Sequence, residues 1–140
     1  MWRYTHNLRN YPGWHLHADS VGCASISNLL DRMLESPYRC KRTLTVIPEC
    51  LEGVYLGARS IAVTSLTIIF PKEEADAEMW SLEHSDLTLQ LTIGDKKVLE
   101  LKNSIDALAS GKYDFAIGPE VNKRRSEGRN RWQEECLWFW

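Results

Sequence analysis

Three polar residues in the stretch GWHLHADSVGC, residues 13 to 23, have the types and the spacing of a metal site. Side chains two residues apart on a β-strand project to the same side, so His15 and His17 could share one zinc or iron ion, with Asp19 as a third ligand. A cupin-like site of this kind needs a further histidine or carboxylate, and His84 is available. The stretch therefore predicts a divalent metal bound by His15, His17 and Asp19.

The same stretch also fits a junction between a strand and a helix. Residues 14 to 18 alternate apolar and histidine side chains, which is typical of a half-buried strand whose histidines face solvent. Asp19 or Ser20 would then cap the first turn of the helix through a side-chain oxygen. Because this interpretation accounts for every residue without a metal ion, we favour it, and the metal site is the alternative.

A further candidate is Cys23, which falls in the first turn of that helix. The partial positive charge at a helix N-terminus lowers the pKa of a thiol, and His15 or His17 would be the base of such a nucleophile. A cysteine among alanine, serine and glycine is more often a small packing residue. No catalytic residue is assigned, because the sequence offers no complete catalytic set around Cys23.

Five basic residues and one acidic residue lie in KRRSEGRNR, residues 123 to 131. Such a patch could bind phosphate or nucleic acid through its arginines, with a tryptophan at its edge for stacking; the residues concerned are Arg124, Arg125, Arg129, Arg131 and Trp132. The basic run is short, and the chain as a whole carries a net charge of -2. A solvated loop is therefore expected, and nucleic acid is not the expected partner.

Four of the six tryptophans lie near the two ends of the chain, at Trp2, Trp14, Trp138 and Trp140. Aromatic side chains form the centre of many protein interfaces, and more often they fill the core. We expect the last two to contribute to a surface for a protein partner or a second copy of the chain. The acidic stretch at residues 73 to 86 is opposite in sign to the basic run, which is compatible with self-association.

Two helices must position these residues. Apolar residues between 26 and 34 recur at helical spacing, so a helix is expected from Ser20 until Pro37 stops it. A second helix is expected over about residues 96 to 110, with Gly111 as its C-cap. The alternative for the second segment is a hairpin into a strand at residues 97 to 101, followed by a shorter helix.

Strands are expected where β-branched or alternating residues run between turn signals. The expected segments are residues 11–18, 42–47, 60–70, 80–82, 86–93, 113–117 and 137–140, with the last two paired as a hairpin. The sequence thus predicts one α+β domain over residues 1–140. It would have a largely antiparallel sheet of five to seven strands, with two helices packed on one face.

Composition narrows the class of protein. With 140 residues, 44% of them hydrophobic and 26% charged, the chain has the size of one domain and is not a disordered acidic or basic protein. No secretory signal is recognisable, and the apolar stretch at residues 61 to 70 is too short to span a bilayer. We expect a cytoplasmic protein with reduced cysteines, and a disulfide between Cys40 and Cys50 is the alternative.

Three segments, WHLHADSVGCASISNLLD, SGKYDFAIGP and the closing LWFW, together resemble a group of small bacterial proteins without an assigned activity. In that group a strand with a tryptophan leads into a helix that starts at Ala-Asp. A Gly-x-x-Asp-aromatic strand follows a helix, and the chain ends in an aromatic strand. The resemblance implies a bacterial, one-domain, cytoplasmic protein.

These observations favour a non-enzymatic binding or protein-interaction module, of the kind that neutralises a toxin or modulates a neighbouring protein. One alternative is a metal-dependent enzyme or sensor built on the two histidines. A second alternative is a phosphate- or nucleic-acid-binding protein built on residues 123 to 131. The candidate binding residues are Arg124, Arg125, Arg129, Trp132, Trp138 and Trp140.

Overall fold

The computed structural model describes residues 1–5, 12–46, 60–72, 77–119 and 135–140. These residues form two helices and nine short strands, and the strands are divided between a four-stranded and a five-stranded sheet. The predicted α+β class is confirmed, as is the mainly antiparallel strand pairing. The strands expected in one sheet are found in two.

Both predicted helices are confirmed. Helix α1 spans Ser20–Glu35 and is capped by Asp19, whose side chain accepts a hydrogen bond from the Gly22 amide at 2.7 Å. Helix α2 spans Asp95–Ala109, so the alternative hairpin for that segment is wrong. After α2 the chain turns away at Gly111, whose φ of 84° favours glycine. Neither of these helices is long and apolar enough to cross a membrane, as judged over the described residues.

The four-stranded sheet has the strand order β3-β5-β7-β6. Strands β5 and β7 run parallel at its centre, and β3 and β6 pair antiparallel with them at the two edges. Serine and threonine side chains lie on one face of this sheet, and apolar side chains on the other face are buried. The bounds are β3 (Cys40–Thr45), β5 (Ser65–Phe70), β6 (Trp80–Ser85) and β7 (Thr88–Ile93).

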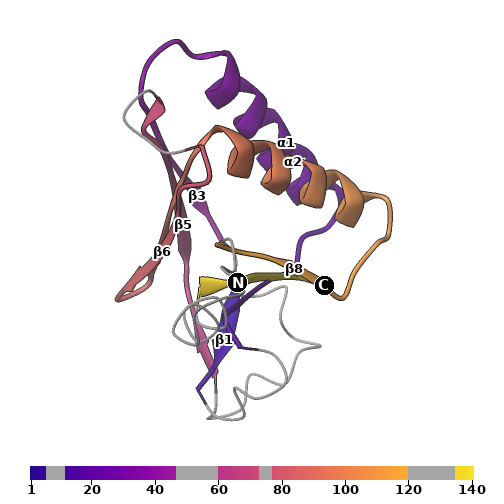
Figure 1. Cartoon of the computed structure of the whole chain (residues 1–140). Coiled ribbons are helices and arrows are strands. Elements are labelled where there is room, and N and C mark those ends of the chain that lie inside the picture. The colour runs from indigo at the N-terminus through magenta and orange to yellow at the C-terminus, as the bar shows by residue number, and fades with distance from the viewer. Residues whose placement is uncertain (6–11, 47–59, 73–76, 120–134) are drawn as a thin grey trace, which may run out of the picture.

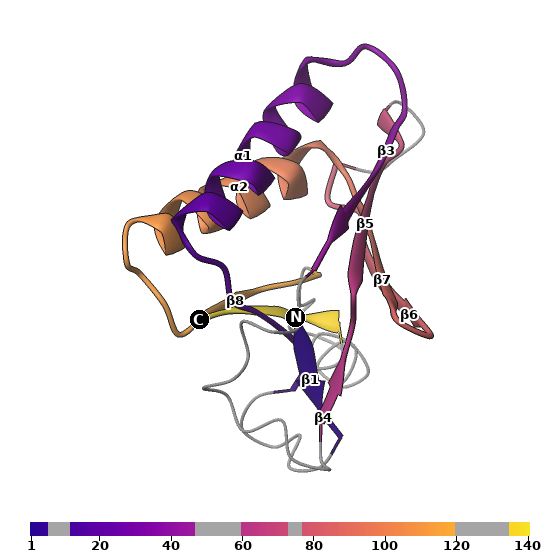
Figure 2. The same cartoon turned by 180° about the vertical axis from the view of Figure 1, so that it is seen from behind.

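Both helices lie on the same face of the four-stranded sheet, as Figures 1 and 2 show from opposite sides. The buried apolar side chains of the sheet belong to one cluster with those of the helices. The helices also pack against each other, because each turns a stripe of apolar residues inward. One hydrophobic cluster joins these stripes to the two sheets; its helical members include Leu30, Met33, Val98, Leu101 and Ile105. The predicted arrangement of two helices on one face is therefore confirmed.

The five-stranded sheet has the strand order β4-β1-β2-β9-β8. Strand β2 lies in its centre, antiparallel to β1 and parallel to β9, and β8 pairs antiparallel with β9 as predicted. Strand β1 was not predicted from the sequence. The bounds are β1 (Trp2–Tyr4), β2 (Trp14–Leu16), β4 (Ser60–Ala62), β8 (Phe115–Ile117) and β9 (Leu137–Phe139).

Residues 60–70, predicted to be one strand, are two strands in different sheets. The change occurs between them, where the backbone amides of two neighbouring residues point to different partners. The Val63 amide donates to the carbonyl of Met1 at 3.2 Å, beside β1, whereas the Thr64 amide donates to the carbonyl of Leu87 at 2.9 Å, beside β7. The chain therefore crosses from the five-stranded to the four-stranded sheet at this point.

The hairpin of β6 and β7 differs from the prediction at its turn. The strand expected over residues 86–93 begins only at Thr88, and Leu87 lies in the turn before it with its side chain 57% exposed. Asp86 in the same turn has a φ of 52°, a conformation that aspartate tolerates better than most residues. The tight turn, rather than the apolar alternation, thus decides where Leu87 points.

Candidate functional site

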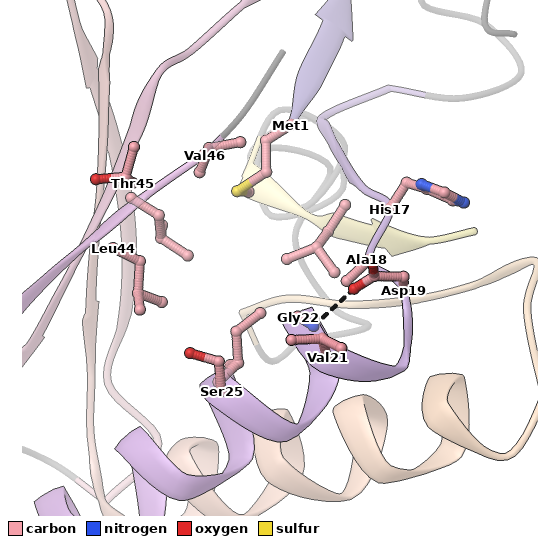
Figure 3. Close-up of a pocket in the computed structure, with 13 residues that line it drawn as sticks. Met1, His17, Ala18, Asp19, Val21, Gly22, Ser25, Leu44, Thr45 and Val46 are labelled. Carbon is pink, nitrogen blue, oxygen red and sulfur yellow. Dashed lines mark hydrogen bonds between the residues drawn. The ribbon is translucent and has the colours of Figure 1, made fainter. Parts of the chain in front are cut away.

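A pocket of about 390 Å³ lies between the start of α1 and the end of β3 (Figure 3). Its walls come from four separate segments of the chain and are mostly apolar. The volume is in the range of sites that hold a small molecule or a side chain of another protein. Six of its apolar lining residues are Met1, Leu16, Val21, Ile26, Leu44 and Val46.

The first turn of α1 forms one wall of the pocket. The helix begins abruptly because the Asp19 carboxylate accepts the hydrogen bond from the Gly22 amide. A Cβ atom at Gly22 would lie 3.2 Å from Ala18 Cβ and 3.2 Å from Asp19 Oδ1, so glycine leaves room for this tight cap. Val21, which is 74% exposed, places an apolar side chain at the mouth of the pocket.

The opposite wall is the end of β3. Leu44 lines the pocket together with Leu66, its partner on the neighbouring strand β5. The Val46 amide donates to the carbonyl of Thr64 at 2.8 Å, which keeps the chain beside β5 for one residue beyond the last residue of β3. The pocket therefore lies where the edge of the four-stranded sheet faces the start of α1.

His17 stands at the rim of this pocket and is exposed. Its imidazole points away from Met1 and Val46 in Figure 3. Strand β2 ends at Leu16, so no strand holds the side chain of His17 on the same side as that of His15. Apolar residues outnumber the polar ones in the lining, and the polar lining residues are His17, Asp19, Ser25 and Thr45.

His15 lies on the face of β2 opposite to its neighbour Leu16, which lines the pocket. It is completely buried, with 0% of its surface exposed. Four aromatic rings surround it: Trp2 at 5.2 Å, Tyr4 at 5.2 Å, Trp138 at 6.3 Å and Trp140 at 5.8 Å between ring centroids. We call these five residues the His15 cluster. The expectation that His15 faces solvent is wrong, because β2 is an inner strand and the aromatic rings cover this face of it.

A hydrogen bond fixes the imidazole of His15 within the cluster. The indole Nε1 of Trp140 donates to His15 Nδ1 at 2.7 Å. An indole N–H can only donate, so His15 Nδ1 is the acceptor in this hydrogen bond. His15 Nδ1 is therefore committed to Trp140 and is not presented to a metal ion.

The three predicted metal ligands are not brought together. His15 is in its aromatic cluster, His17 stands at the pocket rim and Asp19 caps α1. His84, the fourth candidate, packs on Trp14 with ring centroids 5.0 Å apart. Trp14 and His15 are neighbours in β2 and point to opposite faces of the sheet, so His84 lies on the face away from His15. In the part of the chain that the structure describes, no three His, Cys, Asp or Glu side chains are grouped as metal ligands.

Cys23 has the environment of a packing residue. Its side chain is buried, and its Sγ lies 3.8 Å from the carbonyl oxygen of Ala18. Burial raises the pKa of the Cys23 thiol, and the nearby carboxylates of Asp19 and Asp106 raise it further. A nucleophilic cysteine needs a lowered pKa, so the shift is opposite to the one that this chemistry requires.

Cys40 is a buried free thiol, and Cys50, its partner in the alternative disulfide, lies outside the described residues. Cys136 is also buried. The Sγ of Cys136 donates to the carbonyl of Pro12 at 2.8 Å. Burial raises the pKa of the Cys136 thiol to about 11. This thiol therefore stays protonated at neutral pH.

Two of the predicted binding residues lie within the described structure. Trp138 and Trp140 are half-buried members of the His15 cluster, and the indole Nε1 of Trp138 donates to the carbonyl of Pro12 at 2.6 Å. Their rings and donors are thus directed into the protein. The others, together with Arg131, lie outside the described residues: Arg124, Arg125, Arg129 and Trp132.

The apolar residues that line the pocket were not among the predicted site residues. One signal for them is present in the sequence at Val21. This valine precedes the buried Leu30 by nine residues, which is about two and a half helical turns, so it lies on the opposite side of α1. An exposed valine at a helix start is a weak signal alone, and the wall across from it depends on tertiary packing.

No model of a protein family, no characterised protein and no solved structure matches this chain.

Proposed function

We propose that the protein is a non-enzymatic binding module and that its recognition site is the pocket between α1 and β3. The occupant is an apolar group of a protein partner. The observation that carries this proposal is the pocket itself, which combines a mostly apolar lining with an exposed valine at its mouth. The polar residues His17 and Asp19 at its rim would surround the contact, as is usual in protein interfaces.

The energetics favour an apolar occupant. Burying one leucine or phenylalanine side chain contributes roughly 1.5 to 3 kcal/mol, and covering Val21 at the same time would add to this. The carboxylate of Asp19 lies at the helix start, where its negative charge opposes the binding of an anion. An aliphatic or aromatic side chain fits these walls better than a charged ligand.

The expected compartment remains the cytoplasm. The free, buried thiols Cys23 and Cys40 support this proposal, because a reducing compartment keeps cysteines in this form. A partner of the expected kind would be another protein of the same compartment, such as a toxin or a neighbouring protein that this module modulates.

The test is to fill the pocket from α1 and to measure binding of an apolar probe. Ser25 lines the pocket, so Ser25→Leu would occupy it, whereas Asn28→Leu adds the same side chain at an exposed position one helical turn later that is not part of the lining. We expect the dye 8-anilinonaphthalene-1-sulfonate to bind the wild type and Asn28→Leu, and Ser25→Leu to lose most of this binding. Equal dye binding by all three proteins would show that the pocket is not the recognition site.

A further inference from the structure

Strand β3 is an edge strand with basic side chains, and it borders the pocket. Among the described strands its only neighbour is β5. Leu44, Thr45 and Val46 at its end line the pocket, and α1 stands on the far side. The pocket is thus bounded by a helix on one side and by the edge strand of a sheet on the other.

The backbone groups on this edge point outward at alternate residues. Val46 donates to Thr64 across the β3–β5 ladder, and pairs of residues joined by hydrogen bonds alternate in an antiparallel ladder. The amides and carbonyls of Thr43 and Thr45 therefore point away from β5. The amide and carbonyl of Lys41 also point away from β5. The Lys41 carbonyl accepts a hydrogen bond from Arg42 Nη1 at 2.9 Å.

An extended peptide paired with this edge would place side chains into the pocket. Residues opposite each other in neighbouring strands project to the same face of the sheet. A peptide residue opposite Leu44 would thus lie on the face that the helices cover, where the pocket is. The residue two positions along would lie opposite Val46 and could fill the same pocket.

The positive charge on β3 indicates which charged residues a bound peptide would carry. Lys41 and Arg42 are exposed at the other end of the strand, and Arg39 is exposed just before it. The ion pairs formed between described residues involve none of the three. Three like charges on one edge discourage pairing with a second copy of the same edge. They favour a segment that carries carboxylates at this end.

We propose that β3 binds an extended segment of a protein partner as an added strand, with apolar side chains in the pocket and acidic side chains beside Lys41 and Arg42. This inference rests on the proposed function, since it uses the same pocket. Beyond the proposed function, it specifies the conformation and the charge of the bound segment. Main-chain hydrogen bonds to Thr43 and Thr45 would supply affinity, and the pocket and the basic end would supply specificity.

Two peptides of opposite direction serve as probes. In LTVTEE, paired antiparallel to β3, the leucine and valine would lie opposite Val46 and Leu44, and the glutamates opposite Arg42 and Lys41. EETVTL places the same side chains in a parallel pairing. We expect one of the two to bind and to shift the backbone amide signals of Thr43 and Thr45 in NMR spectra of labelled protein.

Methylation of peptide nitrogens tests strand pairing without altering the protein. Only alternate residues of an added strand point their N–H groups at its neighbour. N-methylation of one alternate set should therefore abolish binding of the better peptide, and N-methylation of the other set should leave it within about twofold. Equal tolerance of both sets would overturn strand addition.

Substitution of Thr43 tests the same contact from the protein side. Thr43→Pro removes the outward N–H, which an edge strand tolerates, and Thr43→Val keeps it while losing the same hydroxyl contact with Thr67. We expect peptide binding to weaken about fivefold or more in Thr43→Pro relative to Thr43→Val. Equal affinity of the two variants, with both shown to be folded by thermal melting, would contradict the inference.

Charge reversal tests the acidic end of the segment. At low salt we expect Arg42→Glu to weaken LTVTEE or EETVTL about tenfold and to improve binding of the corresponding lysine peptide. Lys112→Glu, which makes the same change of net charge at an exposed site after α2, should do neither. Equal effects of the two substitutions would remove β3 as the source of charge selectivity.

The outcomes separate this inference from the function on which it rests. If neither peptide binds, or if amide shifts are confined to Val21 and Ser25, strand addition is wrong. In that case loss of dye binding in Ser25→Leu would still support an apolar recognition site. If Ser25→Leu binds the dye like the wild type, the proposed function fails as well.

Discussion

His15 and His17 are two residues apart, yet they belong to regions of opposite character. His15 lies in a sealed aromatic cluster on one face of β2, and its Nδ1 accepts a hydrogen bond from Trp140. His17 lies just after β2, exposed at the rim of an open apolar pocket. The pair with the most obvious chemistry is thus divided between a structural element and a candidate binding surface.

The difference shows what determines the role of a residue in this protein. His15 is held between β1 and β9, so its polar atoms must be satisfied inside the protein. Between Leu16 and α1 the described residues belong to no strand, and His17 is exposed to water. Coverage of the sheet by neighbouring strands, rather than residue type, therefore separates the sealed side from the open side.

The largest expected effect is on the sealed side at Gly13. Its φ is 95°, and a Cβ there would lie 2.4 Å from the carbonyl oxygen of Cys136. The same carbonyl accepts the Trp14 amide at 2.9 Å, which joins β2 to the start of β9. We expect Gly13→Ala to lower the free energy of unfolding by about 4 kcal/mol or to prevent folding, as measured by urea denaturation.

Gly111→Ala is the matched control for this substitution. Gly111 also has a positive φ, of 84°, but a Cβ there would meet nothing within 4 Å. It should lose only about 1 to 2 kcal/mol, the cost of backbone strain alone. Equal losses of stability at the two glycines would mean that the close approach of Gly13 to Cys136 does not contribute to the effect of Gly13→Ala.

The direct comparison of the two histidines has the next largest effect. His15→Ala removes a buried ring from between aromatic side chains and leaves the Trp140 indole without its acceptor. We expect a loss of about 3 kcal/mol in the free energy of unfolding, measured by urea denaturation. His17→Ala should stay within about 0.5 kcal/mol of the wild type. Similar losses for both would refute the division into a sealed and an open side.

A third prediction concerns the pH dependence of the sealed side through Cys136. The ordinary thiol pKa of 9.0 applies to the unfolded chain, and burial raises the pKa to about 11 in the folded protein. Below pH 9 both states hold the proton. Between pH 9 and pH 11 the unfolded state loses it first, so we expect stability to fall with rising pH by roughly 1 to 2 kcal/mol.

Cys136→Ser serves as the control for the alkaline loss. A serine hydroxyl can still donate to the carbonyl of Pro12 and does not ionise in this range. Other groups titrate in both proteins, so the difference between their urea denaturation curves isolates Cys136. An identical alkaline decline in both would show that this thiol does not contribute.

On the open side, the cap of α1 should have a smaller effect. Asp19→Ala removes the acceptor of the Gly22 amide and should cost about 1 kcal/mol, whereas Asp19→Asn, which keeps an oxygen acceptor, should cost less. Thermal melting of the two variants measures the difference. A loss of several kcal/mol in Asp19→Ala would point to a further role for this carboxylate.

The smallest expected effect is that of a metal ion. His15, His17 and Asp19 each have a different environment, so added zinc should shift the melting temperature by less than about 1 °C. Protein purified without a tag should contain no stoichiometric metal by elemental analysis. A full equivalent of metal that is lost in His17→Ala would restore the metal alternative.

Local signals were sufficient to predict the elements whose causes are local. The periodicity of α1, its cap at Asp19 and the turn at Gly111 each depend on residues a few positions apart. The pairing of β8 with β9 followed from two apolar strands near the end of the chain. These predictions needed no knowledge of distant contacts.

Distant contacts decided what could not be predicted. The burial of His15 depends on β9, which lies more than a hundred residues later in the chain and pairs with β2 in parallel. The division of residues 60–70 depends on acceptors at Met1 and Leu87. The pocket likewise exists only because α1 and β3 face each other. The alternation of side chains along a strand does not indicate which of its two faces other parts of the chain will cover.

The place of β9 in the five-stranded sheet also constrains how the chain can fold as it is synthesised. The two helices and the four-stranded sheet use residues 20 to 109, so they can pair before the rest has left the ribosome. Strand β9 lies between β2 and β8, and the five-stranded sheet cannot close until residue 139 has left the ribosome. Until then Trp14 and His15 lack their neighbour on β9, and a nascent chain would expose this apolar strand to chaperones.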